Sequence, residues 1–341
     1  MKKKSNCLMR SFIVVMLLGL IVGSYPAFAE AEKTLKFTST MKQVEMDYLP
    51  NCIGAQYFAD NLPKRTEGKV AVRMFLDGVL GGSAEELIGG VQNGAFEMIA
   101  LALGSWGDYT NAFAPMNIPY LFTNHDEVYA FLDGSIGNKM KEKCEKDTGI
   151  KILSFLDIGF RHVTNSKREI VAPDDMKGLK IRTMNDRNQI AAMRALGASP
   201  TPTSYAELYT ALQQRVVDAQ ENPVFNIMSA KFYEVQKYLS LTSHSYTITA
   251  LGISKALFDS LSPEIQTEIV RLGREAELKS REALTSKEAD VLENLRKYMT
   301  VRALSDRELK AFQEKAKVSW TEIEKEMGSE YFKEVVGAVS K

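Results

Sequence analysis

Apolar and polar positions in the first part of the chain alternate between the two-residue period of strands and the longer period of helices. The expected elements are, in order, strand 34–38, helix 45–65, strand 69–75, helix 83–93 and strand 96–103. Ser83 and Glu86 fit the S-x-x-E capping box that begins a helix. The third strand is almost continuously apolar, as in a strand that is buried on both faces of a parallel sheet. This order predicts an α/β fold.

The same alternation continues as far as residue 253. The expected elements are two helices between 124 and 146, strands 150–155, 159–164 and 179–183, helices 186–196 and 204–214, strand 216–219, a helix after Pro223, and strands 238–242 and 246–253. Because the strand pattern restarts at Gly159, we expect the chain to cross there into a second lobe. The expected first lobe is 30–156 with 243–281, and the second is 157–242 with 282–341.

Helical spacing dominates from residue 262 to the end of the chain. Ser262 is expected as an N-cap, followed by a proline at the first helical position. One helix over 263–299 would be ~55 Å long and would run past both lobes. The alternative is two helices with a kink near Gly273 or Ser280. A final helix is expected over 305–327.

The first residues have the composition of an export signal. Basic residues precede an apolar run over 11–22, which is too short to span a bilayer, and Ala27-Phe28-Ala29 is a typical cleavage site. We expect cleavage after Ala29, which would leave 312 residues in the periplasm. The alternative is an uncleaved anchor.

Charge and cysteine content add little to the predicted function. Cleavage would remove four of the 43 basic residues and none of the 43 acidic ones, for a net charge of −4. That balance argues against nucleic acid or an anionic membrane as a general partner. Cys52 and Cys144 would remain, either as one disulfide or as two buried thiols, and the sequence leaves both open.

No catalytic, cofactor-binding or metal-binding motif is recognisable. The three histidines share no metal-ligand spacing, and H-E-x-x-H, G-x-S-x-G and P-loop patterns are absent from the sequence. We therefore expect no cofactor and no metal. Because catalytic triads need no local motif, an enzyme remains an alternative, with His162, Glu207, Glu221 or Tyr205 as its base.

Two arginines on expected strands, Arg161 and Arg182, are the strongest candidates for a binding site. A guanidinium holds a carboxylate through two parallel hydrogen bonds in a fixed plane. The combination predicts capture of a small anion. The other candidate site residues are Asn185, Tyr205, Asn222, Phe160, Trp106, Gln43 and Tyr48. Trp106 could equally be a core residue, and the two asparagines and Tyr205 could equally be turn or cap residues.

Four segments carry a family resemblance. They are D-M-K-G-L-K-I-R at 175–182, G-A-S-P-T-P at 197–202, Q-E-N-P at 220–223 and K-F-Y-E-V-Q-K-Y at 231–238. In this order they resemble the extracytoplasmic solute receptors of tripartite ATP-independent periplasmic (TRAP) transporters, a family that includes dicarboxylate and sialic acid receptors. The resemblance extends over nearly all of the expected mature chain.

The resemblance implies a two-lobed periplasmic binding protein fold, with an interlobe cleft, crossover strands and a long helix across both lobes. It implies a monomer that delivers a small organic acid to TRAP membrane subunits, which use an ion gradient. Arg182 matches the family's main carboxylate clamp, and Arg161 matches a second arginine. Asn185, Tyr205 and Asn222 match positions that often line the cleft.

The chain departs from the sialic acid receptors in one region. It has Ala102 and Ser105 where those receptors place charged residues, and Phe160 stands where sugar-acid receptors often have a polar group. We therefore expect a smaller or more apolar acid rather than a bulky polyhydroxy acid. The expected function is a receptor for an organic acid, with Arg161 contributing most to diacids. The alternatives are an exported two-lobed enzyme and a ligand-sensing partner of a membrane receptor.

Overall fold

A computed structural model gives the fold of residues 32–339, so the expected export signal lies outside the described residues. The strands are β1 Lys33–Ser39, β2 Val70–Phe75, β3 Met98–Ala102, β4 Ile150–Asn165, β5 Lys180–Thr183, β6 Ser199–Pro202, β7 Ala219–Pro223, β8 Tyr238–Ser254 and β9 Thr300–Ala303. The α-helices are α1 Pro50–Arg65, α2 Ala84–Gln92, α3 His125–Asp133, α4 Ser135–Thr148, α5 Arg187–Ala195, α6 Tyr205–Gln213, α7 Val224–Ser229, α8 Lys255–Ser260, α9 Pro263–Leu295, α10 Asp306–Ala316, α11 Trp320–Met327 and α12 Ser329–Val339.

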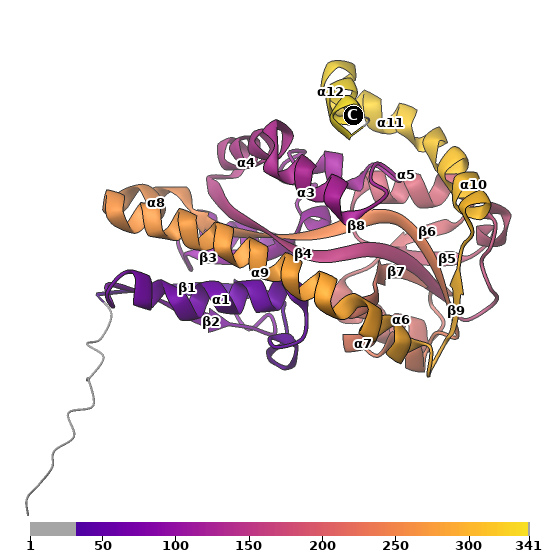
Figure 1. Cartoon of the computed structure of the whole chain (residues 1–341), viewed down its shortest axis with the longest axis horizontal. Helices are drawn as coiled ribbons and strands as arrows, with labels where there is room; N and C mark the ends of the chain where they lie inside the picture. Colours follow the sequence, from indigo (N-terminus) through magenta and orange to yellow (C-terminus); the bar gives the residue numbers. More distant parts are fainter. Residues whose placement is uncertain (1–31, 340–341) are drawn as a thin grey trace, which may run out of the picture.

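The strands form a sheet in the order β2-β1-β3-β8-β4-β7-β5-β6, with β9 also paired to β8. β1 runs parallel to β2 and β3, and β5 runs parallel to β6 and β7. The long strands β4 and β8 are antiparallel and pass through the whole molecule (Figure 1). We call the part built on β1–β3 the first lobe and the part built on β5–β7 and β9 the second lobe. The α/β prediction is confirmed.

β4 and β8 correct the sequence prediction, which divided each of them into two strands. β4 has register shifts against β8 on both sides of Gly159, whose φ is 108°. In β8, Ser243 has a positive φ of 46° and lies where the pairing with β4 is interrupted. A bulge inserts an extra residue without ending a strand, so the polar and glycine residues that suggested a break mark bulges instead.

Two short strands were missed, and the last helices are shorter than predicted. β6 contains Pro200 and Pro202, and it lies at the edge of the sheet, where proline is tolerated because one side needs no ladder hydrogen bonds. β9 precedes α10 and pairs with the beginning of β8. The expected helix 305–327 is divided into α10, the 3-10 helix Lys317–Ser319 and α11, and α12 follows.

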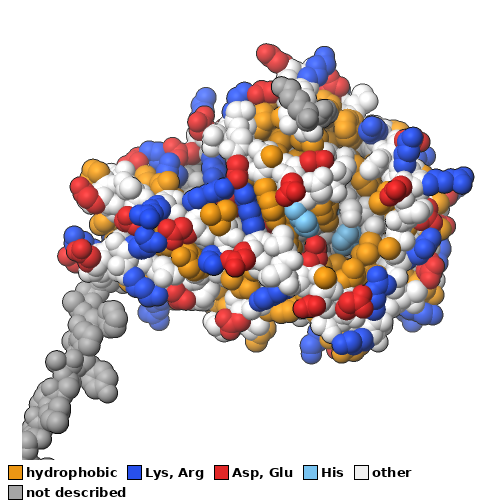
Figure 2. Space-filling model, in the orientation of Figure 1, with side chains coloured by type: hydrophobic (Ala, Val, Ile, Leu, Met, Phe, Trp, Pro, Cys, Tyr) orange, Lys and Arg blue, Asp and Glu red, His pale blue; other side chains and the backbone are white. Residues whose placement is uncertain are grey.

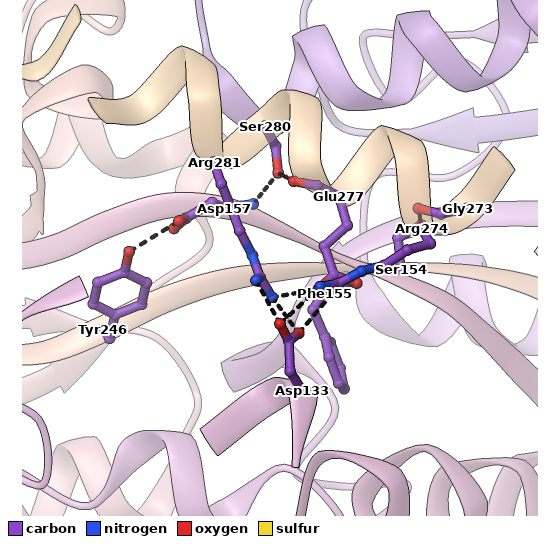
Figure 3. Close-up of polar contacts among 10 residues, drawn as sticks. All are labelled: Asp133, Ser154, Phe155, Asp157, Tyr246, Gly273, Arg274, Glu277, Ser280 and Arg281. Atoms are coloured by element: carbon purple, nitrogen blue, oxygen red, sulfur yellow. Dashed lines mark hydrogen bonds and ion pairs between the residues drawn. The ribbon is translucent and has the colours of Figure 1, made fainter. Parts of the chain in front are cut away.

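The prediction of one long helix is confirmed, because α9 continues through Gly273 and Ser280. Both residues serve the contact with β4 (Figure 3). A Cβ at Gly273 would lie 3.0 Å from the carbonyl oxygen of Leu153, and the Ser280 hydroxyl accepts a 2.9 Å hydrogen bond from the Asp157 backbone N–H. The suspected kink residues are thus the ones that allow close packing.

α9 covers an edge of β4 that no strand covers. β7 pairs only with the last five residues of β4, so the same edge of its earlier part needs other partners. Glu277 accepts a 3.2 Å hydrogen bond from the Phe155 N–H, and Ser154 donates 2.6 Å to the Gly273 carbonyl (Figure 3). Arg281 also binds Asp133 at the end of α3, at 2.8 Å. These contacts fasten the long helix to both β4 and α3.

Charged side chains of both signs share the surface, and the two cysteines of the described residues are not paired. On the face shown in Figure 2, acidic and basic side chains are interspersed rather than gathered into one field of a single sign. Within residues 32–339, no helix is long and apolar enough to cross a membrane. Cys52 and Cys144 are buried, free thiols, which decides the question that the sequence left open.

Candidate functional site

Arg182 lies near the end of β5 with an unusual set of partners. Its side chain is only 2% exposed, and its Nε donates a 2.8 Å hydrogen bond to the carbonyl oxygen of Thr203. Within the part of the chain that the structure describes, no acceptor reaches its two Nη atoms. Burial lowers the pKa of Arg182 to about 10, so the group is still charged at neutral pH. A buried guanidinium with a free outer edge suits an incoming anion.

Arg161, on β4, is held very differently. Its Nε and Nη2 bind the Glu221 carboxylate, the second at 2.7 Å, and its Nη1 donates to Thr247 at 2.7 Å. Nη2 also reaches the Glu221 carbonyl oxygen and, at 3.3 Å, the side-chain oxygen of Asn222. Arg161 and Glu221 are both about 1% exposed or less. The charge of Arg161 is therefore cancelled inside the protein.

His244, on β8, completes this buried network. Its Nε2 lies 3.0 Å from Glu221, and its Nδ1 lies 2.8 Å from the Thr242 hydroxyl. With a proton on Nε2, the His244 ring donates to Glu221, and its Nδ1 can accept from the Thr242 hydroxyl. Burial would raise the pKa of Glu221, but the Arg161 charge and the His244 hydrogen bond outweigh it and hold the pKa at about 2. Glu221 is thus ionised at any physiological pH.

The two arginines are brought together by strand pairing. β7 lies between β4 and β5, with Arg161 opposite Pro223 and Arg182 opposite Gln220. The pKa of Arg182 is lowered by burial first, and the charges of Glu221 and Arg161 also act on it. Tyr205, at the start of α6, lies near Arg182, whose charge acts on its hydroxyl. Arg161, Arg182, Asn222 and Tyr205 therefore form one cluster.

Two predicted site residues lie elsewhere. Trp106 is fully buried, donates from its indole to the Leu101 carbonyl oxygen at 3.4 Å, and packs edge-on against Phe113. That is the core position that the sequence allowed as an alternative. Phe160 packs edge-on against Tyr246 with ring centres 4.7 Å apart, whereas the neighbouring Thr247 binds Arg161. Because side chains alternate along a strand, Phe160 faces away from the arginine cluster.

Of three other predicted site residues, two lie where the lobes meet and the third is exposed on the first lobe. Asn185 is exposed and donates a 3.1 Å hydrogen bond to Asp108 of the first lobe. Tyr48 is half-buried, with its ring centre 5.9 Å from that of Phe225 at the second lobe's α7. Gln43 is exposed on the 3-10 helix η1 Gln43–Glu45. These positions place Tyr48 and Asn185 between the lobes without bringing them into contact with the arginines.

Two buried polar residues of the first lobe were missed by the sequence reasoning. Glu45, which ends η1, is 5% exposed, and its Oε1 has no hydrogen-bond partner among residues 32–339. Asn51 is also 5% exposed; its amide nitrogen donates 3.2 Å to Thr249 while its oxygen has no partner in the same range. Both stand near the start of α1, where the sequence suggested an ordinary amphipathic helix. Only their burial reveals them.

The four candidate bases of the enzyme alternative are poorly suited to that role. Burial, with His244 and Arg161, lowers the pKa of His162 to about 3, and its Nδ1 accepts from the Ser243 N–H. Burial raises the pKa of Tyr205 to about 12. Glu221 is bound to Arg161, and the exposed Glu207 accepts a hydrogen bond from the Ser204 hydroxyl. Across residues 32–339, no group of three or more His, Cys, Asp or Glu side chains is arranged to hold a metal.

Comparison with known proteins gives a consistent result. Residues 42–326 match the family described as bacterial extracellular solute-binding protein, family 7. The 2,3-diketo-L-gulonate-binding periplasmic protein YiaO of Escherichia coli is 36% identical over 296 residues, which is 86% of this chain and 88% of that protein.

Solved structures agree with this likeness. A TRAP periplasmic solute-binding protein from Polaromonas, bound to D-erythronate, has a TM-score of 0.82 and 32% identity, over 89% of this chain and 98% of that one. Another, from Sulfurospirillum deleyianum with bound succinate, has a TM-score of 0.82 and 28% identity, over 89% and 98%. The two ligands share a carboxylate and differ in hydroxyl content and in charge.

Proposed function

The chain belongs to family 7 of the bacterial extracellular solute-binding proteins, and we propose that it captures a small organic acid through Arg182 and delivers it to TRAP membrane subunits. The relatives named above bind carboxylates, so the chemistry that Arg182 offers fits the family. Delivery requires reversible binding only. The poor fit of the four candidate bases to proton transfer supports a receptor rather than an enzyme.

The observation that carries this proposal is the free outer edge of Arg182. Nε is fixed by Thr203, which orients the guanidinium plane, and the two Nη atoms are left to bind an anion. A buried charge without a partner is costly, and a carboxylate that makes two parallel hydrogen bonds offsets this cost. Ligand binding and relief of an unpaired charge are thus the same event.

We propose that the lobes close over the ligand as a hinge about β4 and β8, the two strands that pass between them. The proposed boundaries place 30–156 with 243–281 in one lobe and 157–242 with 282–341 in the other. The hydrogen bond from Asn185 to Asp108 supports two lobes that meet, since it joins a loop of one to a loop of the other. A monomer suffices, because both lobes come from one chain.

The experiment is a ligand titration of residues 30–341 with a panel of carboxylates, sugar acids and neutral sugars. We expect at least one acid to raise the melting temperature by mass action and to bind in calorimetry. Arg182→Ala should weaken its binding about 100-fold or more, because two hydrogen bonds to charged groups are lost. Arg194→Ala removes an exposed arginine from α5 and should leave affinity unchanged.

The variant also distinguishes lost binding from lost folding. Arg182→Ala removes an unpaired buried charge, so the free protein should melt no earlier than the wild type. Unchanged affinity in a folded Arg182→Ala protein would show that this arginine is structural. Binding of neutral sugars alone would contradict the acid-receptor proposal.

A further inference from the structure

We propose that this site selects a hydroxylated monocarboxylate over a dicarboxylate, and that Glu45 accepts a hydrogen bond from a hydroxyl of the ligand. The inference rests on the proposed function, because it assumes that Arg182 holds the ligand's carboxylate. It revises the expectation of a small or apolar acid, which was based on the sequence around Ala102, Ser105 and Phe160.

The charge balance of the site argues for one carboxylate. Glu221 cancels Arg161, both within a network that is almost completely buried, so Arg182 is the cation of the cluster that still lacks a counter-charge. Arg161 uses Nε and Nη2 on Glu221 and one hydrogen of Nη1 on Thr247. One N–H of Nη1 remains, which suits a single hydrogen bond to a neutral ligand oxygen. A second ligand carboxylate would have to compete with Glu221.

Glu45 argues for a hydroxyl donor at the other end of the ligand. Its Oε2 accepts a 3.2 Å hydrogen bond from the Lys42 N–H, whereas its Oε1 is buried without a partner among the described residues. An ionised carboxylate only accepts hydrogen bonds, so its natural ligand partner is an O–H group. A second ligand carboxylate placed here would be repelled by the like charge.

Glu45 lies close enough to Tyr205, at the start of α6 in the second lobe, for its charge to act on that phenol. Burial raises the pKa of Tyr205 to about 12, and the charges of Glu45 and Arg182 act on the same phenol with opposite signs. Tyr205 therefore lies within electrostatic reach of both groups. Tyr205 thus lies near both an acceptor, Glu45, and a cation, Arg182.

Asn51 is placed near the arginine cluster by independent contacts. It binds Thr249, and Thr247 two residues earlier on β8 binds Arg161. Residues two apart share one face of a strand and lie about 7 Å from each other along it. Asn51 therefore lies on the Arg161 face of β8, with its unpartnered oxygen available to a second hydroxyl.

The experiment compares matched acids of equal length. D-Erythronate, butyrate and succinate each have four carbons, and D-gluconate, hexanoate and adipate each have six. Binding of each to the mature chain is measured by calorimetry with wild type, Glu45→Gln and Asp47→Asn. Asp47 is an exposed acid in the same loop, so its variant matches the charge change away from the site.

We expect at least one of the two hydroxylated acids to bind at least about ten-fold more tightly than the plain acid and the diacid of its length. Glu45→Gln should weaken the hydroxylated acid about ten-fold and leave the plain acid unchanged, while Asp47→Asn should change neither. A diacid that binds more tightly than its hydroxylated counterpart would overturn the inference. So would an unchanged preference in folded Glu45→Gln protein.

The two proposals fail in different ways. If Arg182→Ala abolishes binding but Glu45→Gln has no effect on it, the receptor proposal survives and the role of Glu45 is wrong. If none of the six acids binds while another acid of the titration panel does, this inference fails and the receptor proposal survives. Should Glu45→Gln not fold, the wild-type preference between matched acids still decides the substrate class.

Discussion

Replacing Glu221 with glutamine tests the buried network that determines the charge of the cleft. Glutamine keeps the shape of the side chain but puts an amide N–H₂ group where Arg161 and His244 require an acceptor. Arg161 is then left as a buried charge without a counter-charge. Its other contacts, to Thr247 and Asn222, carry no charge and cannot replace the carboxylate.

The magnitude follows from the structure in two ways. Removing one partner of a buried ion pair costs about 3–5 kcal/mol of unfolding free energy. The pKa of Glu221 is about 2 in the folded protein against an ordinary value of 4.5, and this difference corresponds to about 3 kcal/mol. We therefore expect Glu221→Gln to lower the unfolding free energy by about 3 kcal/mol at pH 7.

The sign of the pH dependence gives a second, independent test. A carboxyl whose pKa is lowered by folding stabilises the protein above its unfolded pKa, and this contribution is lost as the pH falls from about 4.5 toward 2. Glu221→Gln has no such group. The difference between wild type and variant should therefore shrink from about 3 kcal/mol at pH 7 to about half of that at pH 3.

The assay is urea unfolding followed by circular dichroism at several pH values between 3 and 7. Glu207→Gln is the matched control, because it makes the same chemical change at an exposed position on α6 and should cost less than about 0.5 kcal/mol. A loss below about 1 kcal/mol for Glu221→Gln, or a difference that does not depend on pH, would refute the reasoning.

Two further predictions concern packing and protonation away from the arginine cluster. Burial raises the pKa of Asp157 to about 6, so the stability that this group contributes is lost as the pH rises from about 4 to 6. Asp157→Asn should remove that decline of about 3 kcal/mol in the same urea assay, and a decline that persists in the variant would contradict this prediction. A Cβ at Gly54 would lie 2.7 Å from the Ala276 carbonyl oxygen of α9, so Gly54→Ala should lower the unfolding free energy by about 1–3 kcal/mol. Gly89→Ala, which has open space around the new methyl group, should be neutral or stabilising, and equal effects of the two variants would argue against close packing of α1 on α9.

Much of the fold was predictable because many helices and strands are determined by patterns of neighbouring residues. The alternation of β1, the continuous apolar run of β3, the capping box of Ser83 and Glu86, and the Ser262-Pro263 start of α9 can each be recognised within a few residues. The boundaries of β4 and β8 were not, because a bulge at Gly159 has the same local signature as a loop. The prolines of β6 likewise looked like a turn, since edge position is a property of the whole sheet.

The site was predictable only in part for a related reason. Arg182 and Arg161 could be chosen by residue type and strand placement, but whether each is free or neutralised depends on the register between β4 and β7. That register brings Glu221 to Arg161 and leaves Arg182 without a carboxylate. Glu45 carries no sequence signal, because an acid near a helix start is usually exposed. Its significance comes from burial without a partner.

The most direct test of the account is a crystal structure of the mature chain with the acid that binds most tightly in the titrations. We expect the ligand carboxylate to lie within hydrogen-bond distance of both Nη atoms of Arg182, with the Arg161–Glu221 pair intact and a ligand hydroxyl at Oε1 of Glu45. A ligand carboxylate bound elsewhere, with Arg182 in contact with protein groups only, would show that Arg182 does not bind the ligand.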